Sequence, residues 1–124
     1  MRALSPRLPP LVLAAVLALS ARGVGQNRVV PDSLAAQYVG QAVTVEGTVV
    51  KVTFSRRSNT TFLNFGQPYP DQVFTAVVFR SAASQFPNPQ QWEGKRVRVT
   101  GRVRLYQGKP EIVLERPSQL QAAP

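Results

Sequence analysis

The sequence predicts an all-β domain folded as a small barrel of five strands, and three observations support this prediction. Apolar and polar residues alternate over several short stretches, the period of a half-buried strand. Breaks rich in Gly, Pro, Asn and Ser separate these stretches. The pattern V-x-V-x-G-x-V occurs twice, at residues 43–49 and 97–103. Glycine inside a strand marks a bulge or bend, and long bent strands allow a small barrel to close.

The first elements come from residues 31–54. Pro31, Asp32 and Ser33 stand ahead of the run LAAQYVG, which predicts a capped helical turn closed by Gly40. Valines then alternate with Thr and Glu in VTVEGTV, so the first strand runs from residue 43 to about Phe54. Its glycine occupies an inward position, where a side chain would collide.

The second and third strands follow a polar loop at residues 55–59. Residues 60–65 form a short strand rich in aromatic residues, and the run GQPYPD ends it. Residues 73–79, VFTAVVF, are the third strand. Strict alternation separates inward from outward residues on both strands. We assign the following residues to the core: Leu63, Phe65, Phe74, Ala76 and Val78.

The last part of the chain contributes a short helix and two strands. Residues 81–86 are compatible with a helix that Pro87 ends. The fourth strand is long, at residues 96–106, and a turn at Gln107 and Gly108 leads into the fifth strand at 110–115. Trp92 lies between the helix and the fourth strand, and we expect it to cap the open end of the barrel together with Phe86.

Composition excludes several kinds of catalytic and metal site. The 124 residues suit one domain and contain no His and no Cys. A His-based triad, a thiol nucleophile, a Cys or His zinc site, a haem and an iron–sulfur cluster are therefore excluded. The six carboxylates are dispersed and form no D-x-D-like metal cluster. The sequence thus predicts no cofactor, no metal and no enzymatic activity.

The N-terminus has the pattern of a secretory signal peptide. Arg2 and Arg7 precede the apolar run LVLAAVLAL, and small residues follow at positions 20–25. The run is shorter than the roughly 20 residues that span a bilayer. We expect residues 1–25 to be removed, leaving a secreted or periplasmic protein with no stable membrane insertion. The alternative is an uncleaved N-terminal anchor. The net charge then falls from +9 to +6, with 12 basic and 6 acidic residues, which favours a polyanionic partner.

The order of elements resembles the OB-fold, a five-stranded Greek-key barrel with a short helix between its third and fourth strands. The sequence is similar to bacterial OB-fold modules of the nucleic-acid-binding, tRNA-anticodon-type group. Three segments carry this likeness: VGQAVTVEGTVVKV (39–52), TFLNFGQPYPDQVFTAVVF (61–79) and GKRVRVTGRVRLYQGKPEIVLERPSQL (94–120). It covers residues 33–120. It implies a binder of single-stranded nucleic acid across the second and third strands, although the fold also carries oligosaccharide and protein binders.

Four arginines share the outward face of the fourth strand. Two interpretations remain open for Arg96, Arg98, Arg102 and Arg104. Same-face residues repeat about every 6.6–6.8 Å, so the row could follow a phosphate backbone. Alternatively, it is a solvated face partly neutralised by Glu46 on the neighbouring first strand.

The expected ligand groove lies on the outward face of the second and third strands and in the loops beside it. Outward aromatic residues would stack on bases, and basic loop residues would contact phosphates. The alternatives are that each Phe belongs to the core and that the Arg pair is merely solvated. The predicted nucleic-acid-binding residues are Arg56, Arg57, Phe62, Asn64, Tyr69, Thr75, Phe79, Tyr106 and Lys109.

Two functions are consistent with these residues. The first is a non-catalytic OB-fold protein that binds single-stranded nucleic acid with little sequence preference. The second is a module of the cell envelope that binds a protein or an acidic polysaccharide. The basic charge and the resemblance favour the first, whereas export favours the second, because free nucleic acid is scarcer outside the cytoplasm.

Overall fold

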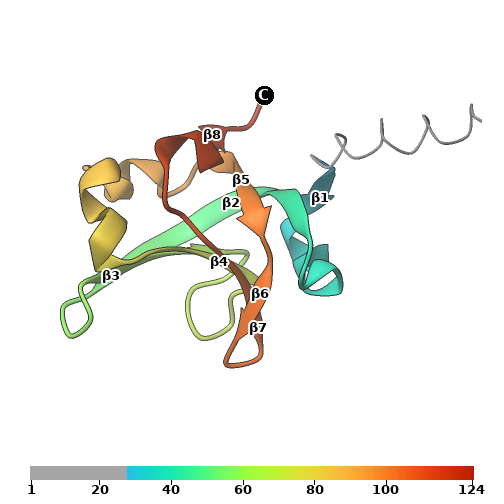
Figure 1. Ribbon diagram of the computed structural model, residues 1–124, viewed down its shortest axis with the longest axis horizontal. Coiled ribbons are helices and arrows are strands. Elements are labelled where there is room, and N and C mark those ends of the chain that lie inside the picture. Colours follow the sequence, from blue (N-terminus) through green and yellow to red (C-terminus); the bar gives the residue numbers. More distant parts are fainter. Residues whose placement is uncertain (1–27) are drawn as a thin grey trace, which may run out of the picture.

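The computed structural model describes residues 28–124, which form eight strands and four short 3-10 helices (Figure 1). The predicted signal peptide at residues 1–25 lies outside these residues. No helix in the described part of the chain has both the length and the hydropathy to cross a membrane. The elements are β1 (Val29–Pro31), η2 (Asp32–Tyr38), β2 (Ala42–Ser55), β3 (Thr60–Phe65), β4 (Phe74–Val78), η3 (Arg80–Gln85), η4 (Pro89–Trp92), β5 (Arg96–Arg102), β6 (Arg104–Tyr106), β7 (Lys109–Val113), η5 (Pro117–Gln119) and β8 (Leu120–Ala122).

The strands of residues 28–124 form one sheet in the order β6-β7-β4-β3-β2-β5-β8, with β1 beside β2. The pairs β1–β2 and β4–β7 are parallel and the others are antiparallel. The predicted all-β class is therefore confirmed, and so are the helical segments expected before Gly40 and at residues 81–86, which are η2 and η3. The short helix η4 was not predicted.

The sheet has eight strands rather than the predicted five. The expected fourth strand changes partner at Val103, because β5 pairs with β2 whereas β6 pairs with β7. The remaining additions, β1 and β8, have three residues each, which is too short to show an alternating pattern in the sequence. The turn after β6 is as predicted: Gln107 and Gly108 both have positive φ, as a two-residue hairpin turn requires.

The long strand β2 serves two parts of the sheet. Its first half pairs with β5, from Ala42 to Thr48, and its second half pairs with β3, from Val49 to Ser55. The register shifts between Val49 and Lys51. The sequence predicted a bulge or bend at Gly47, so the observed irregularity lies further along the strand than predicted.

Both repeated glycines nevertheless lie in close contact with other parts of the chain. A Cβ at Gly47 would lie 2.6 Å from the Asp32 carboxyl carbon, and one at Gly101 would lie 2.6 Å from Ile112 Cγ2. Real Cβ atoms essentially never approach so closely. The expectation that a side chain would collide at these two positions is confirmed.

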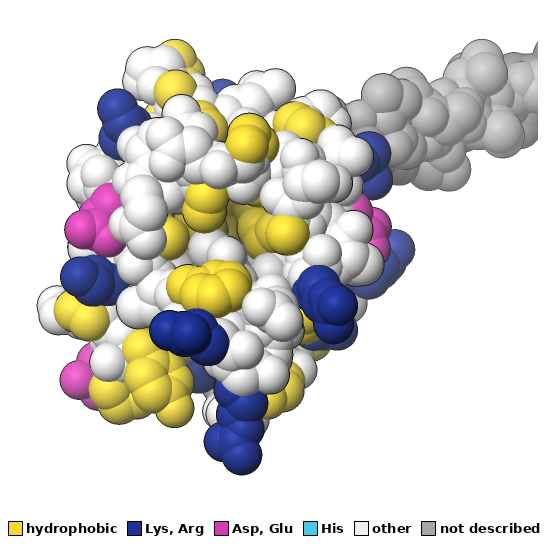
Figure 2. All heavy atoms as spheres, turned by 90° about the vertical axis from the view of Figure 1, so that its left-hand side faces the viewer, with side chains coloured by type: hydrophobic (Ala, Val, Ile, Leu, Met, Phe, Trp, Pro, Cys, Tyr) yellow, Lys and Arg dark blue, Asp and Glu magenta, His cyan; other side chains and the backbone are white. Residues whose placement is uncertain are grey.

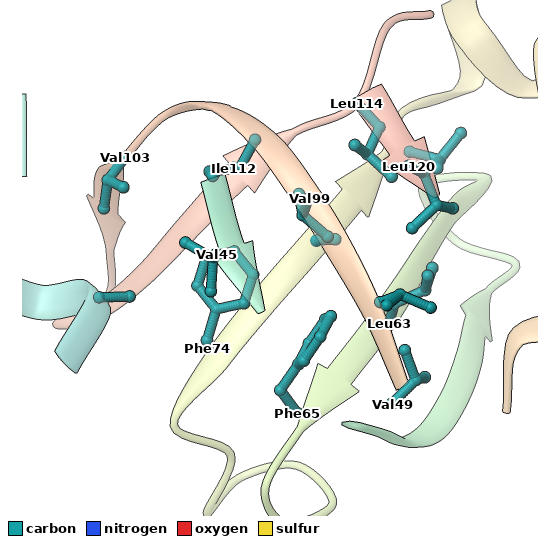
Figure 3. Close-up of a cluster of buried hydrophobic side chains, with 14 of the residues drawn as sticks. Val45, Val49, Leu63, Phe65, Phe74, Val99, Val103, Ile112, Leu114 and Leu120 are labelled. Carbon is teal, nitrogen blue, oxygen red and sulfur yellow. The ribbon is translucent and has the colours of Figure 1, made fainter. Parts of the chain in front are cut away.

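The core lies between the curled strands, with side chains from β2, β3, β4, β5 and β7 interdigitated (Figure 3). Phe65 and Phe74 meet edge to face at a centroid distance of 5.0 Å. All five residues that the sequence assigned to the core on β3 and β4 are buried. Phe86 and Trp92 pack against this core and line a cavity of about 160 Å³ beside η3 and η4.

Candidate nucleic-acid interface

A groove of about 740 Å³ runs over the outer face of the sheet. Its walls come from the end of β2, from β3 and β4, from the loop between them, and from the β6–β7 hairpin. The lining residues are Lys51, Thr53, Phe54, Ser55, Phe62, Asn64, Pro68, Tyr69, Pro70, Gln72, Thr75, Tyr106, Gln107, Lys109 and Glu111.

Strand register explains why residues so far apart in the sequence share this groove. Lys51 on β2 pairs with Asn64 on β3, Asn64 pairs with Thr75 on β4, and Thr75 pairs with Glu111 on β7. Directly paired residues point to the same face of a sheet, so these four form one row across four strands. Thr53 and Phe62 are the neighbouring pair on the same face.

The floor of the groove is polar and buried. Asn64, Gln72, Thr75 and Glu111 are each at most 7% exposed. The Asn64 amide donates to Thr53 Oγ1 at 3.4 Å, and the Gln72 amide nitrogen donates to Thr75 Oγ1 at 3.2 Å. The Glu111 carboxylate accepts a hydrogen bond from Arg104 Nε at 2.7 Å. These bonds fix the orientation of the floor residues before any ligand arrives.

Aromatic and basic side chains form the rim. Phe54, Tyr69 and Tyr106 are 53%, 68% and 55% exposed, and the Phe62 ring is half-buried. Lys51 is exposed, and Lys109 Nζ donates to the Gln72 carbonyl at 3.0 Å. Within residues 28–124, neither lysine lies within ion-pair distance of a carboxylate. On the side of the molecule that Figure 2 presents, Lys and Arg side chains likewise stand beside exposed hydrophobic ones.

Six of the nine predicted binding residues line this groove: Phe62, Asn64, Tyr69, Thr75, Tyr106 and Lys109. The other three do not. Arg56 and Arg57 lie exposed in the turn between β2 and β3, beyond the lining residue Ser55. Phe79 follows β4, and the guanidinium carbon of Arg104 lies 5.7 Å from its ring centroid.

The sequence placed Asn64 and Thr75 on the outer surface, and this needs a correction. They do point to the groove face, but they are only 1% and 4% exposed. Asn64 is paired with Lys51 and Thr75, and the Gln72 side chain bonds Thr75 from the segment before β4, so neighbours cover residues that strand alternation alone would leave exposed.

Sequence reasoning missed several residues of the groove. Strict alternation from Thr44, Glu46 and Thr48 would have placed Lys51 and Thr53 inward, and only the register shift between Val49 and Lys51 turns them to the groove. Glu111 could not be found either, because its place beside Thr75 depends on the parallel pairing of β4 with β7. Gln72 precedes β4 in an irregular segment, and no periodic pattern identifies it.

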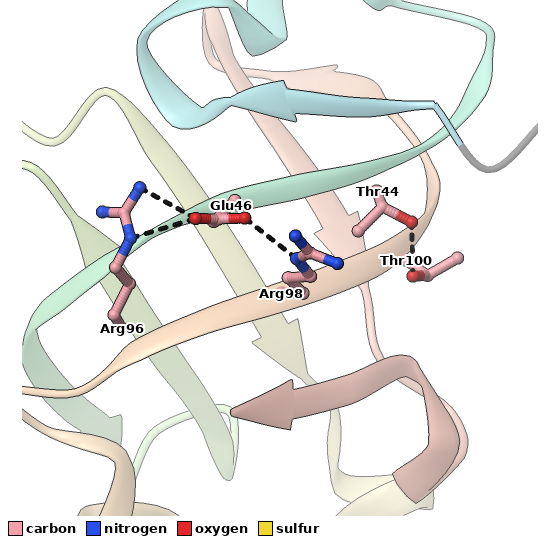
Figure 4. A network of polar contacts seen from close by, with 5 residues as sticks. All are labelled: Thr44, Glu46, Arg96, Arg98 and Thr100. Carbon is pink, nitrogen blue, oxygen red and sulfur yellow. Dashed lines mark hydrogen bonds and ion pairs between the residues drawn. The ribbon is translucent and has the colours of Figure 1, made fainter. Parts of the chain in front are cut away.

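The arginines on β5 and β6 bond to groups of the protein itself, and Figure 4 shows Arg96 and Arg98 on either side of Glu46. Glu46 accepts from Arg98 Nε at 2.9 Å and from Arg96 Nε at 3.0 Å, which confirms the expected cross-strand pairing. The bonds from Arg98 and Arg96 hold the pKa of the Glu46 carboxyl below its usual value. Arg102 donates to the Gly40 carbonyl, and Arg104 bonds Glu111. For these residues, the structure matches the partly neutralised face rather than a free row of cations.

Carboxylates elsewhere do not converge. No group of three or more acidic residues in the described chain is placed to hold a metal ion. Asp32 is separate from the groove, beside Gly47, and burial raises the pKa of its carboxyl.

Comparisons with known proteins show similarity of fold. No family model matches the chain, and no curated protein matches it. Among solved structures, a chain described as an aspartyl-tRNA synthetase from Leishmania major Friedlin matches over 95% of this chain with a TM-score of 0.52 and 11% identity. An aspartyl tRNA synthetase from Entamoeba histolytica matches over 97%, with a TM-score of 0.52 and 16% identity. This chain spans only 22% and 26% of those two chains. At these identities the likeness concerns the fold alone, and it is consistent with the expected OB-type architecture.

Proposed function

We propose that this chain is a non-catalytic OB-fold module, a Greek-key barrel extended by short strands, that binds single-stranded nucleic acid in the groove. Binding is of low sequence preference, needs no cofactor and involves no reaction. Residues 1–25 direct the protein to the periplasm or the exterior. The likeness of fold to part of two synthetase chains supports the architecture, and the groove itself supports the ligand.

The observation that carries this proposal is the set of solvent-exposed aromatic rings around a polar floor. Phe54, Tyr69 and Tyr106 offer their rings to solvent, although burying each of them would be favourable for a protein with no ligand. A base stacked on such a ring gains roughly 1–3 kcal/mol whatever its identity. Several rings along one groove therefore suit successive bases of a single strand.

Basic residues complete the site. Lys51 and Lys109 line the groove, while Arg56 and Arg57 extend the positive charge along the turn at its end. Phosphate contacts by such residues release counterions and make binding depend on salt. Duplex nucleic acid would not expose its bases to the rings, so the groove favours a single strand.

The experiment is fluorescence anisotropy of a labelled single-stranded oligonucleotide over a series of salt concentrations. We expect saturable binding that weakens as salt rises but persists in part, because stacking does not release counterions. Heparin serves as an acidic polysaccharide without bases. If heparin and the oligonucleotide bind with equal affinity, and both affinities are lost as salt rises, the groove is a general polyanion-binding surface. Absence of oligonucleotide binding at low salt would end the proposal and favour a protein partner in the envelope.

A further inference from the structure

A carboxylate lies in the floor of the groove, although the groove is proposed to bind a polyanion. Glu111 lines the groove and is only 5% exposed. Lys109 lines the same groove two residues earlier on β7, so the two Cα atoms are about 6.6–6.8 Å apart. A phosphate bound at Lys109 would therefore lie at a distance from the carboxylate comparable with the Debye length, about 8–10 Å in 0.10–0.15 M salt. Without compensation, the negative charge of Glu111 would oppose the binding of that phosphate.

Arg104 supplies the compensating charge from outside the groove. It is not among the residues that line the groove, and it is paired with Glu111 across the β6–β7 hairpin. Its Nε and Nη2 atoms both lie 2.7 Å from Glu111 Oε2. This is the length of charge-assisted hydrogen bonds. Together the two side chains carry no net charge.

The guanidinium of Arg104 is held from a second side as well. Its central carbon lies 5.7 Å from the centroid of the Phe79 ring, within the range of a cation–π contact. Two separate contacts thus hold the guanidinium against Glu111 and beside a ring that is itself outside the groove. This position suits the guanidinium to masking the carboxylate rather than to contacting a strand in the groove.

We propose that Arg104 is a positioning residue for nucleic-acid binding, which acts through Glu111. By cancelling the charge of that carboxylate, Arg104 allows a phosphate backbone to enter the groove without itself contacting a phosphate. This inference rests on the proposed binding of single-stranded nucleic acid. Arg102, on the same row of arginines, has no such role, because it donates to the Gly40 carbonyl rather than to a carboxylate.

The test measures the affinity of the full chain and of charge variants for one single-stranded oligonucleotide at low salt. Arg104→Gln leaves Glu111 uncompensated and should weaken binding roughly two- to fifteenfold, the Coulomb effect of one charge about 10 Å away at an effective dielectric constant of about 20–80. Glu111→Gln should strengthen binding by a similar factor. The double variant, which carries both substitutions, has a neutral pair again and should bind as the wild type does. Arg102→Gln is the matched control and should leave the affinity unchanged.

An uncharged ligand separates the effect of charge from a change in the shape of the groove. A methylphosphonate oligonucleotide of the same sequence has the same bases but no backbone charge. Its affinity should be the same in the wild type and in each variant. The ratio of the two affinities within one variant therefore reports the charge effect alone, since a distorted groove would weaken both ligands together.

The proposal stays testable if Arg104→Gln fails to fold, because the other variants decide it. A lower affinity ratio in the double variant than in the wild type would show that Arg104 itself contacts phosphate, and this would overturn the proposal. Equal oligonucleotide affinity of Glu111→Gln and wild type would also overturn it, because the charge of Glu111 would then have no effect. Both results would leave the proposed function standing. Binding of no oligonucleotide by the wild-type chain would overturn both.

Discussion

Two faces of the molecule carry basic residues, and the basic side chains have different partners on the two faces. On the β2–β5 face, Arg96 and Arg98 share the carboxylate of Glu46, and Arg102 is bonded to a main-chain carbonyl. In the groove, Lys51 lies beside exposed aromatic rings, and no carboxylate of residues 28–124 is within ion-pair distance of it. Both faces are built on the same strand β2, whose first half pairs with β5 and whose second half pairs with β3.

The difference shows that charge density alone does not locate a binding surface. The arginine row is the denser run of charge in the sequence, but each of its guanidiniums already donates to a carboxylate or a carbonyl of the protein. A phosphate would compete with these partners for the guanidiniums. Because exposed ion pairs contribute only about 0–1 kcal/mol each, exchanging one partner for another brings little gain. We therefore expect changes on the β2–β5 face to alter stability and changes in the groove to alter affinity.

The largest effect on stability is expected at Gly101. Gly101→Val places a side chain against Ile112, which is fully buried, so unfolding free energy should fall by about 1–3 kcal/mol through overpacking. Gly47→Val should cost less, because the obstructing Asp32 carboxyl is only partly buried and can rotate away. Chemical denaturation of both variants measures the difference. An unchanged midpoint for Gly101→Val would show that the two strands do not pack as described.

The aromatic rim should dominate affinity. Phe62→Ala and Tyr69→Ala should each weaken oligonucleotide binding by about 1–3 kcal/mol, the value of one lost stacking contact. The slope of log affinity against log salt should stay nearly constant, because no phosphate contact is removed. Arg98→Ala, on the other face, is the control and should leave affinity unchanged. If Arg98→Ala weakened oligonucleotide binding and the two aromatic variants did not, the ligand would bind the β2–β5 face rather than the groove.

Basic groove residues should change the salt dependence. Lys51→Ala should lower the slope by about 0.7, the value for one phosphate contact on a single strand. The same measurement on Arg56→Ala and Arg57→Ala tells whether the strand continues past the groove onto the turn between β2 and β3. Arg102→Ala should leave the slope as it is. A slope that falls with Arg102→Ala but not with Lys51→Ala would contradict the assignment of the groove.

The smallest effect is expected from the ion pairs of Glu46. Arg98 and Arg96 lower the pKa of this carboxyl in the folded protein, so its contribution to stability is present above its ordinary pKa of 4.5 and is lost as pH falls through the lowered value. Glu46→Gln should therefore be slightly less stable than wild type at neutral pH and converge with it in acid. Melting temperatures of both proteins over a pH series test this. A constant difference at every pH would mean that the charge of Glu46 does not contribute.

Much of the fold could be predicted because its strands are amphipathic. Alternation correctly placed Leu63 and Phe65 in the core and gave β3 its bounds of residues 60–65. The change of partner at Val103 could not be predicted, because the apolar alternation continues through it without interruption. Such a break depends on which strands lie on either side, and local sequence does not encode that directly.

For the candidate site, the sequence found side chains that follow a periodic pattern or stand in a loop next to a strand. Phe62 and Tyr106 were found in this way, whereas Glu111 and Gln72 were not. Their positions follow from the β4–β7 pairing and from the folded path of the β3–β4 loop. Phe79 was predicted to bind ligand from strand alternation alone, but it follows the end of β4 and does not line the groove.

The cavity beside η3 and η4 has a spectroscopic consequence. It contains Trp92, the single tryptophan of the sequence, and shares no lining residue with the groove. Two of the three tyrosines, Tyr69 and Tyr106, stand in the groove instead. Tryptophan emission should therefore change on unfolding but hardly on ligand binding. A base stacked in the groove should instead quench tyrosine emission. One unlabelled sample thus contains two independent optical reporters, one for stability and one for occupancy.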